Sequence, residues 1–64
     1  MSDDTLQQQI RVELAKLYDD AGAMGFLAAR QKLLNGRIPA RMIAIGDGAE
    51  VLRVLRAIND GVYL

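Results

Sequence analysis

The chain contains no cysteine and no histidine among its 64 residues. Without these side chains it has no disulfide framework, no thiolate nucleophile and no imidazole acid or base. It also lacks the ligands that cysteine and histidine metal sites use. Carboxylates are therefore the only remaining candidates for catalytic groups.

Long apolar runs are also missing. No stretch approaches the roughly 20 apolar residues that a membrane-spanning helix requires. The first five residues, Met1 to Thr5, are polar and acidic, unlike the positively charged start of a secretion signal. We expect a cytoplasmic protein without a membrane span.

Aromatic residues are few, with one Phe, two Tyr and no Trp, and the formal net charge is zero. The charges are nevertheless uneven, since residues 1–29 carry five acids and two bases and residues 30–64 carry three acids and six bases. Nucleic-acid binding depends on neutralised phosphates and on stacking aromatics, both of which are scarce here. We therefore do not expect direct nucleic-acid binding, although a basic cluster could support it: Arg30, Lys32, Arg37 and Arg41.

The length allows a single domain over residues 1–64. A chain of this size buries only about 60% of the surface that its unfolded form exposes. Its stability is therefore expected to be modest, and a bound partner would add to it.

The first helix is expected to begin at Thr5, because Asp4 is a suitable N-cap and Gln7 can return a bond to it. Asp19 and Asp20 would end this helix and cap the next. Apolar residues at spacings of four, four and three form a helical stripe, whereas three charged residues fall largely off it and are expected to face water. The stripe is Leu6, Ile10, Leu14 and Leu17, and the charged residues are Arg11, Glu13 and Lys16.

Residues 21–29 are small and apolar and include Gly22 and Gly25. Each glycine weakens an isolated helix by roughly 1 kcal/mol relative to alanine, so tertiary packing must hold this segment. The small side chains, Ala23 among them, would let a second helix approach closely, which leaves a homo-oligomer open. Phe26 and Leu27 are expected in the core, since aromatic side chains bury large areas.

Asn35 and Gly36 could form a hairpin turn, but no alternating strand flanks them. A loop with Gly36 at positive φ is the better interpretation. Pro39 suits the first turn of a third helix. Its apolar side would consist of Met42, Ile43 and Ile45, and Gly46 would end it.

The last helix is predicted to start with a capping box formed by Asp47 and Glu50. Asn59, Asp60 and Gly61 would end it. The sequence thus predicts an all-α fold, a small bundle of about four short helices. The core face of the last helix is Val51, Leu52, Leu55 and Ile58.

No catalytic constellation emerges from the carboxylates. Asp19 and Asp20, like Asp47 and Glu50, lie where helix caps are expected, and neither pair has a nucleophilic companion. Residues 46–48 lack the preceding strand and the lysine of a phosphate-binding loop. We expect no enzyme activity, no cofactor and no metal site.

The C-terminal residues Val62, Tyr63 and Leu64 follow a flexible joint at Gly61. Tyrosine is favoured at binding hot spots because it supplies a large contact area with little loss of rotamer entropy. These residues could bind a partner or fold back onto the core.

Arg37 also has two possible roles, as an internal brace of its turn or as a contact to an acidic partner.

Residues from about 12 to 64 resemble the toxin-binding domain of Xre/MbcA/ParS antitoxins. That family has a Trp-Leu pair, a Leu-Gly-Gly-Arg-(Ser/Thr)-Pro turn, a Glu-Gly-containing turn and a terminal Gly-Val-aromatic sequence. The corresponding residues here are Phe26-Leu27, Leu34-Asn35-Gly36-Arg37-Ile38-Pro39, Gly48, Val51-Leu52 and Ile58-Asn59-Asp60-Gly61-Val62-Tyr63.

The resemblance implies an all-helical module that inhibits a RES-domain toxin, an enzyme that consumes NAD⁺. Inhibition in the family places the antitoxin's C-terminal end in or over the active-site cleft of the toxin. Carried over by position, the partner-binding residues would be Gly61, Val62, Tyr63 and Leu64, with Arg37 at the rim.

The chain departs from the family at several positions. Ile38 replaces a hydroxyl residue, Asn35 replaces a glycine, and only residues 1–11 precede the match, where members usually carry a helix-turn-helix region. Autorepression through DNA is therefore not implied. The alternative is a mobile-element inhibitor or adaptor that uses the same module against another host protein, including a DNA-binding regulator.

Overall fold

The computed structural model describes residues 3–61, which form an all-α fold. Four α-helices and one short 3₁₀ helix, η1, make up this part of the chain. The elements are α1 (Asp3–Leu17), α2 (Asp20–Ala28), η1 (Lys32–Leu34), α3 (Pro39–Ala44) and α4 (Gly48–Asn59). The prediction of a small bundle of about four short helices is confirmed.

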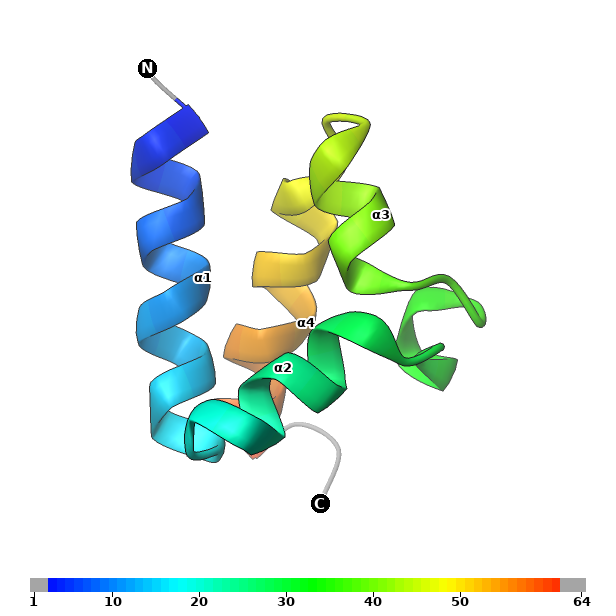
Figure 1. Ribbon diagram of the computed structural model, residues 1–64. Coiled ribbons are helices and arrows are strands. Elements are labelled where there is room, and N and C mark those ends of the chain that lie inside the picture. The colour runs from blue at the N-terminus through cyan, green and yellow to red at the C-terminus, as the bar shows by residue number, and fades with distance from the viewer. Residues whose placement is uncertain (1–2, 62–64) are drawn as a thin grey trace.

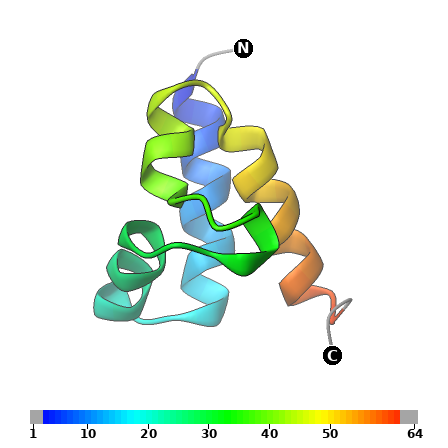
Figure 2. The ribbon, with the colours of Figure 1, turned by 90° about the vertical axis from the view of Figure 1, so that its right-hand side faces the viewer.

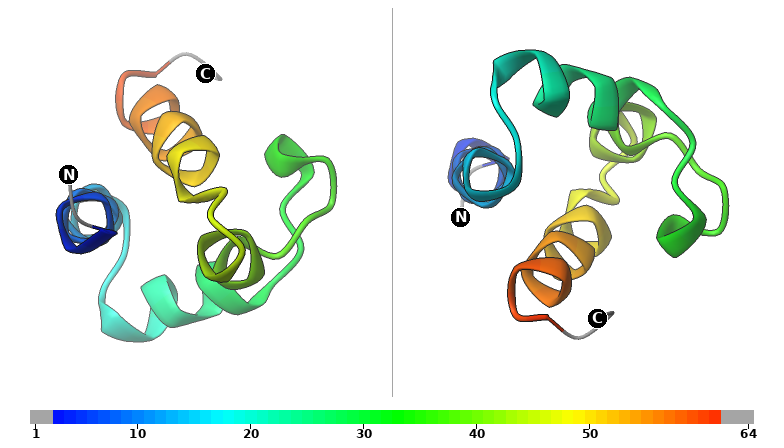
Figure 3. Two further views of the ribbon diagram at one scale, coloured as in Figure 1. Left: turned by 90° about the horizontal axis from the view of Figure 1, so that it is seen from above. Right: turned by 90° about the horizontal axis from the view of Figure 1, so that it is seen from below.

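The helices α1 and α4 pack along each other and run in the same direction, whereas α3 runs back between the end of η1 and the start of α4 (Figures 1 and 2). Seen along α1, helix α2 spans from the end of α1 to α3 (Figure 3). Helix α4 packs against α1, α3 and η1. None of the helices in residues 3–61 is long and apolar enough to cross a membrane.

The core is the meeting point of the apolar faces, and α4 contributes more of it than any other element. Phe26 is 7% exposed, as expected of a core anchor, and its ring stacks on Tyr18 with centroids 5.8 Å apart. Leu27 and Ile58 are partly buried against the cluster. The buried apolar residues are Ile10, Leu14, Phe26, Leu34, Met42, Val51, Leu52, Val54 and Leu55.

Helices approach closely at Gly48, the first residue of α4, which is buried. A Cβ atom there would lie 3.1 Å from Cδ2 of Leu6 and 3.6 Å from both Cδ1 of Ile10 and Cγ1 of Ile43. Gly48 thus lets the start of α4 lie against α1 and α3. The glycines of α2 do not serve this purpose, because Tyr18 Cβ would stand 3.0 Å from a Cβ on Gly22 and nothing lies within 4 Å of one on Gly25.

Three predicted helix boundaries are confirmed. Asp19 is the N-cap of α2, and its Oδ1 accepts a hydrogen bond from the Gly22 amide at 2.8 Å. Pro39 is the first residue of α3. Gly61 follows the end of α4 with φ +77°.

The start of α1 was predicted two residues too late. The helix begins at Asp3, so Asp4 lies inside it instead of capping it from outside.

Glu13 was wrongly expected to face water, since it is 9% exposed. It follows Ile10 by three positions and therefore shares the inner side of α1. The Nδ2 atom of Asn59, at the end of α4, donates to Glu13 Oε1 at 2.9 Å and to the Glu13 carbonyl oxygen at 3.2 Å. Lys16 Nζ lies 3.2 Å from Oε2. The buried carboxylate is thus satisfied by groups from both helices.

Candidate functional site

A surface hollow of about 340 Å³ lies beside the turn that joins η1 to α3. Three arginines line it, from the segment that follows α2, from the turn and from α3. We call it the basic hollow. Its lining residues are Arg30, Asn35, Gly36, Arg37, Ile38, Arg41, Met42 and Ile45.

The backbone of the turn holds one wall of the basic hollow in place. Asn35 and Gly36 both have positive φ, 59° and 77°, as the sequence predicted for Gly36. The Gly36 amide donates to the Gln31 carbonyl at 2.9 Å, and the Gln31 amide donates to the Arg37 carbonyl at 3.0 Å. The turn therefore closes with a single bridge between Gln31 and Arg37, without the two strands of a hairpin.

The side chain of Gln31 fixes the approach to this turn from α2. Its Nε2 donates to the carbonyl oxygens of Phe26 at 3.0 Å and Ala29 at 3.4 Å. Phe26 is itself anchored in the core, so the segment that carries Arg30 is tied to the interior. The position of Arg30 beside the turn follows from this connection.

Arg37 makes an internal contact, one of the two roles predicted for it. Its Nη2 lies 2.7 Å from Oδ2 of Asp47, and both side chains are nearly half exposed, at 45% and 47%. An ion pair this exposed contributes about 0–1 kcal/mol, so it braces the turn only weakly. The guanidinium retains exposed surface beside the hollow, and its predicted role in partner binding stays a prediction.

The hollow carries more positive than negative charge. Among residues 5–61, whose side chains are described, no hydrogen bond or ion pair engages the guanidinium of Arg30 or of Arg41. One carboxylate, Asp47, balances one of the three arginines. The remaining two charges are available to an acidic ligand, and guanidinium groups are well suited to bind carboxylates through paired donors.

The expected capping box of α4 is wrong, and its failure explains the Asp47 contact. Asp47 has φ −97° and ψ 22°, away from the extended conformation of a capping residue, and makes no side-chain cap bond. Its carboxylate is turned to Arg37 instead.

Glu50 accepts a hydrogen bond from Arg53 at 2.8 Å, which holds the pKa of Glu50 below its ordinary value. The pair is exposed, so the stability it adds is small and is lost as the pH falls through this lowered pKa.

Ile45 was expected on the buried side of α3 but is 70% exposed. It is the C-cap of the helix, with φ −97° and ψ 9°, and Gly46 with φ +92° then reverses the chain. The side chain therefore leaves the face that Met42 occupies in the core. Its apolar surface lies at the edge of the basic hollow.

The structure separates the two parts of the predicted site. The ion pair with Asp47 places Arg37 near the start of α4, whereas Gly61 follows its end. The 12 residues of α4 rise about 18 Å between these points. Val62, Tyr63 and Leu64 lie outside the described residues.

The hollow includes residues that the predicted site did not. Arg30 and Arg41 belong to the basic cluster noted in the sequence, and the structure brings both beside Arg37, but Lys32 does not line the hollow. The uneven charge of residues 30–64 was the signal that could have indicated them. Residues 3–61 contain no group of three or more carboxylates placed to hold a metal ion.

No family model matches the chain, and neither the curated protein sequences nor the solved structures yielded a match to it. The resemblance to antitoxin toxin-binding domains rests on the quoted motifs alone.

Proposed function

We propose that this protein binds and inhibits a partner protein, as an antitoxin neutralises a RES-type toxin that consumes NAD⁺. In this proposal the protein acts in the cytoplasm and is not itself an enzyme. The basic hollow anchors an acidic part of the partner's surface. The end of α4 and residues 61–64 reach the partner's active-site cleft.

The observation that carries the proposal is the position of the motif turn in the basic hollow. Four successive residues of the Leu-Asn-Gly-Arg-Ile-Pro segment, residues 35–38, line it. Other residues of the resemblance, such as Phe26, Val51 and Leu52, are explained by the core. The turn residues instead line the basic hollow, and a charged hollow on the surface is better explained by binding of a partner than by a contribution to stability.

The character of the hollow favours a protein ligand. Arginines stand beside the exposed apolar side chain of Ile45, a combination that fits a surface with both carboxylates and aliphatic groups. The residues that line the hollow include no aromatic ring on which a base could stack. The zero net charge of the chain also gives little attraction for a phosphate backbone.

Inhibition is tested with a RES-domain protein from the same genome, by following NAD⁺ consumption as the full chain is added. Deletion of residues 62–64 is expected to abolish inhibition, because the tail would no longer enter the cleft. The helical circular dichroism should stay nearly unchanged. Loss of the fold on deletion would show instead that these residues belong to the core.

Charge reversal in the basic hollow tests the second contact. Arg41→Glu is expected to weaken inhibition at least about tenfold, since a like-charge contact at an interface costs several kcal/mol. Lys32→Glu is the matched control, because Lys32 is an exposed cation of the same region that does not line the hollow. Equal effects of the two variants would contradict a role for the hollow. A genome without a RES-domain protein would contradict the assignment of the partner.

A further inference from the structure

A second hollow, of about 550 Å³, lies between α1 and α2. We call it the α1–α2 hollow. Its lining is mainly apolar and includes Leu14, Ala15, Tyr18 and Met24. The two hollows have no lining residue in common.

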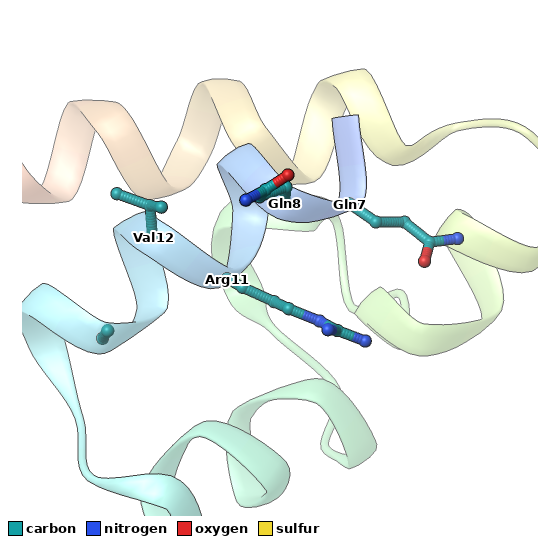
Figure 4. A pocket seen from close by; sticks show the side chains of 5 residues that line it. Gln7, Gln8, Arg11 and Val12 are labelled. Carbon is teal, nitrogen blue, oxygen red and sulfur yellow. The ribbon is translucent and has the colours of Figure 1, made fainter. Parts of the chain in front are cut away.

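The concave surface continues along α1 beyond this hollow. A neighbouring hollow of about 590 Å³ shares Arg11 and Ala15 with it and extends to Val12. Figure 4 shows Gln7, Gln8, Arg11 and Val12 projecting from this stretch of α1. Successive turns of α1 therefore line a concave surface on this side.

Exposed apolar side chains gather along this surface. The structure has five large exposed hydrophobic residues among those whose burial is described, and three of them line these two hollows: Val12 at 50%, Tyr18 at 40% and Met24 at 71%. Such clustering on a small protein is typical of an interaction surface.

The charges of the α1–α2 hollow lie at its two ends. Arg11 lies at one end, and Asp19 and Asp20 at the other. Arg11 and Asp20 make no ion pair among the side chains of residues 5–61, and Asp19 uses one carboxylate oxygen to cap α2. The six residue steps from Arg11 to Leu17, the last residue of α1, correspond to a rise of about 9 Å, and Asp19 and Asp20 follow beyond that helix end, so the positive and negative ends are separated.

The charges along the α1–α2 hollow of one copy complement those of a second copy placed in the opposite direction. If a second copy lies antiparallel with a two-fold axis near Ala15, the Arg11 end of each copy faces the acidic end of the other. The small side chain of Ala15 lets the helices approach at the crossing point. Val12 of each copy then faces the region of Tyr18 and Met24 of the other, so the apolar surfaces coincide as well.

We propose that the protein forms a two-fold symmetric homodimer through the α1–α2 hollow, with Arg11 of each copy paired to Asp19 and Asp20 of the other. The dimer presents two basic hollows and does not depend on the identity of the partner. Its symmetry makes every contact occur twice.

Charge reversal tests the pairing directly, with sedimentation velocity of the full chain as the measurement. Arg11→Glu and Asp20→Arg should each raise the dimer Kd at least about tenfold, because each creates two like-charge contacts. An equimolar mixture of the two variants should restore a dimer, since the mixed pair again has opposite charges at both contacts. Restoration in the mixture is the result that a merely structural defect would not give.

Arg41→Glu is the matched control, because it reverses an exposed arginine in the basic hollow and should leave the dimer Kd unchanged. Circular dichroism of each variant establishes that the helices remain. A full chain that sediments as a monomer at millimolar concentration overturns the proposal. Failure of the mixture to dimerise, or dissociation caused by Arg41→Glu, also overturns it.

Discussion

Leu55→Ala is expected to lower the free energy of unfolding by about 2–5 kcal/mol, the usual loss when a fully buried leucine is truncated. Leu55 has 0% exposure and lies within α4, which packs against α1, α3 and η1. Stabilities of about 0.05–0.15 kcal/mol per residue imply a total of only about 3–10 kcal/mol for a chain of this length. The variant should therefore be partly or wholly unfolded at 25 °C, as measured by urea denaturation followed by circular dichroism.

Leu33→Ala provides the control, because the chemical change is the same and Leu33 in η1 is 44% exposed. Its truncation leaves no closed cavity, and the loss should be well under half of that for Leu55→Ala. Equal losses at the two positions would mean that α4 is not the centre of the core.

Asn59→Ala is expected to lower the free energy of unfolding by about 1.5–3 kcal/mol, the range for hydrogen bonds to charged groups. Its Nδ2 donates to two oxygens of Glu13, the side-chain Oε1 and the main-chain carbonyl. Without this donor, the hydrogen bond from Lys16 is the one that the side chains of residues 5–61 still give to a glutamate that is 9% exposed. Urea denaturation measures the loss.

A double-mutant cycle separates this contact from the loss of the side chains themselves. Asn59→Ala combined with Glu13→Ala should destabilise less than the sum of the two single variants, because each removes the same interaction. The pair of Glu50 and Arg53 supplies the control, since it is exposed and should couple far more weakly. Additive losses for Asn59 and Glu13 would contradict the proposed bridge between α1 and α4.

Local sequence signals predicted the elements well where a regular period or a backbone restriction was present. The stripe from Leu6 to Leu17 forms the inner face of α1, and Pro39 begins α3. Positive φ at Gly36 follows from the glycine itself, which adopts this conformation without steric cost. These signals depend on neighbours in the chain, so they could be evaluated without the tertiary structure.

Predictions that depended on the choice of a distant partner were less successful. Asp47 was expected to cap α4, but the structure places Arg37, ten residues earlier, within 2.7 Å of its carboxylate. Glu13 looked like a solvent-exposed residue because its donor, Asn59, lies 46 residues away. Ile45 lost its place on the inner face because α3 ends one residue before it.

In the candidate site, too, the residues were predictable from the sequence but their arrangement in space was not. The basic cluster and Arg37 were visible in the sequence, but only the packing of α2, the turn and α3 brings Arg30, Arg37 and Arg41 around one hollow and leaves Lys32 outside it. The asymmetry between an apolar hollow with charged ends and a basic hollow was not predictable from composition. It arises from the spatial placement of residues that are far apart in the chain.

The sequence by itself determined the helical class, the core faces of α1 and α4 and the residues of the turns. Helical periodicity and backbone conformational preference act over a few residues, which is why they suffice for these features. Only the tertiary structure decided which charges meet, that Glu13 is buried, that Gly48 lies close against α1 and α3, and where the surface is hollow. Ion pairing, burial and surface shape depend on distances between helices, and those distances exist only once the helices have packed.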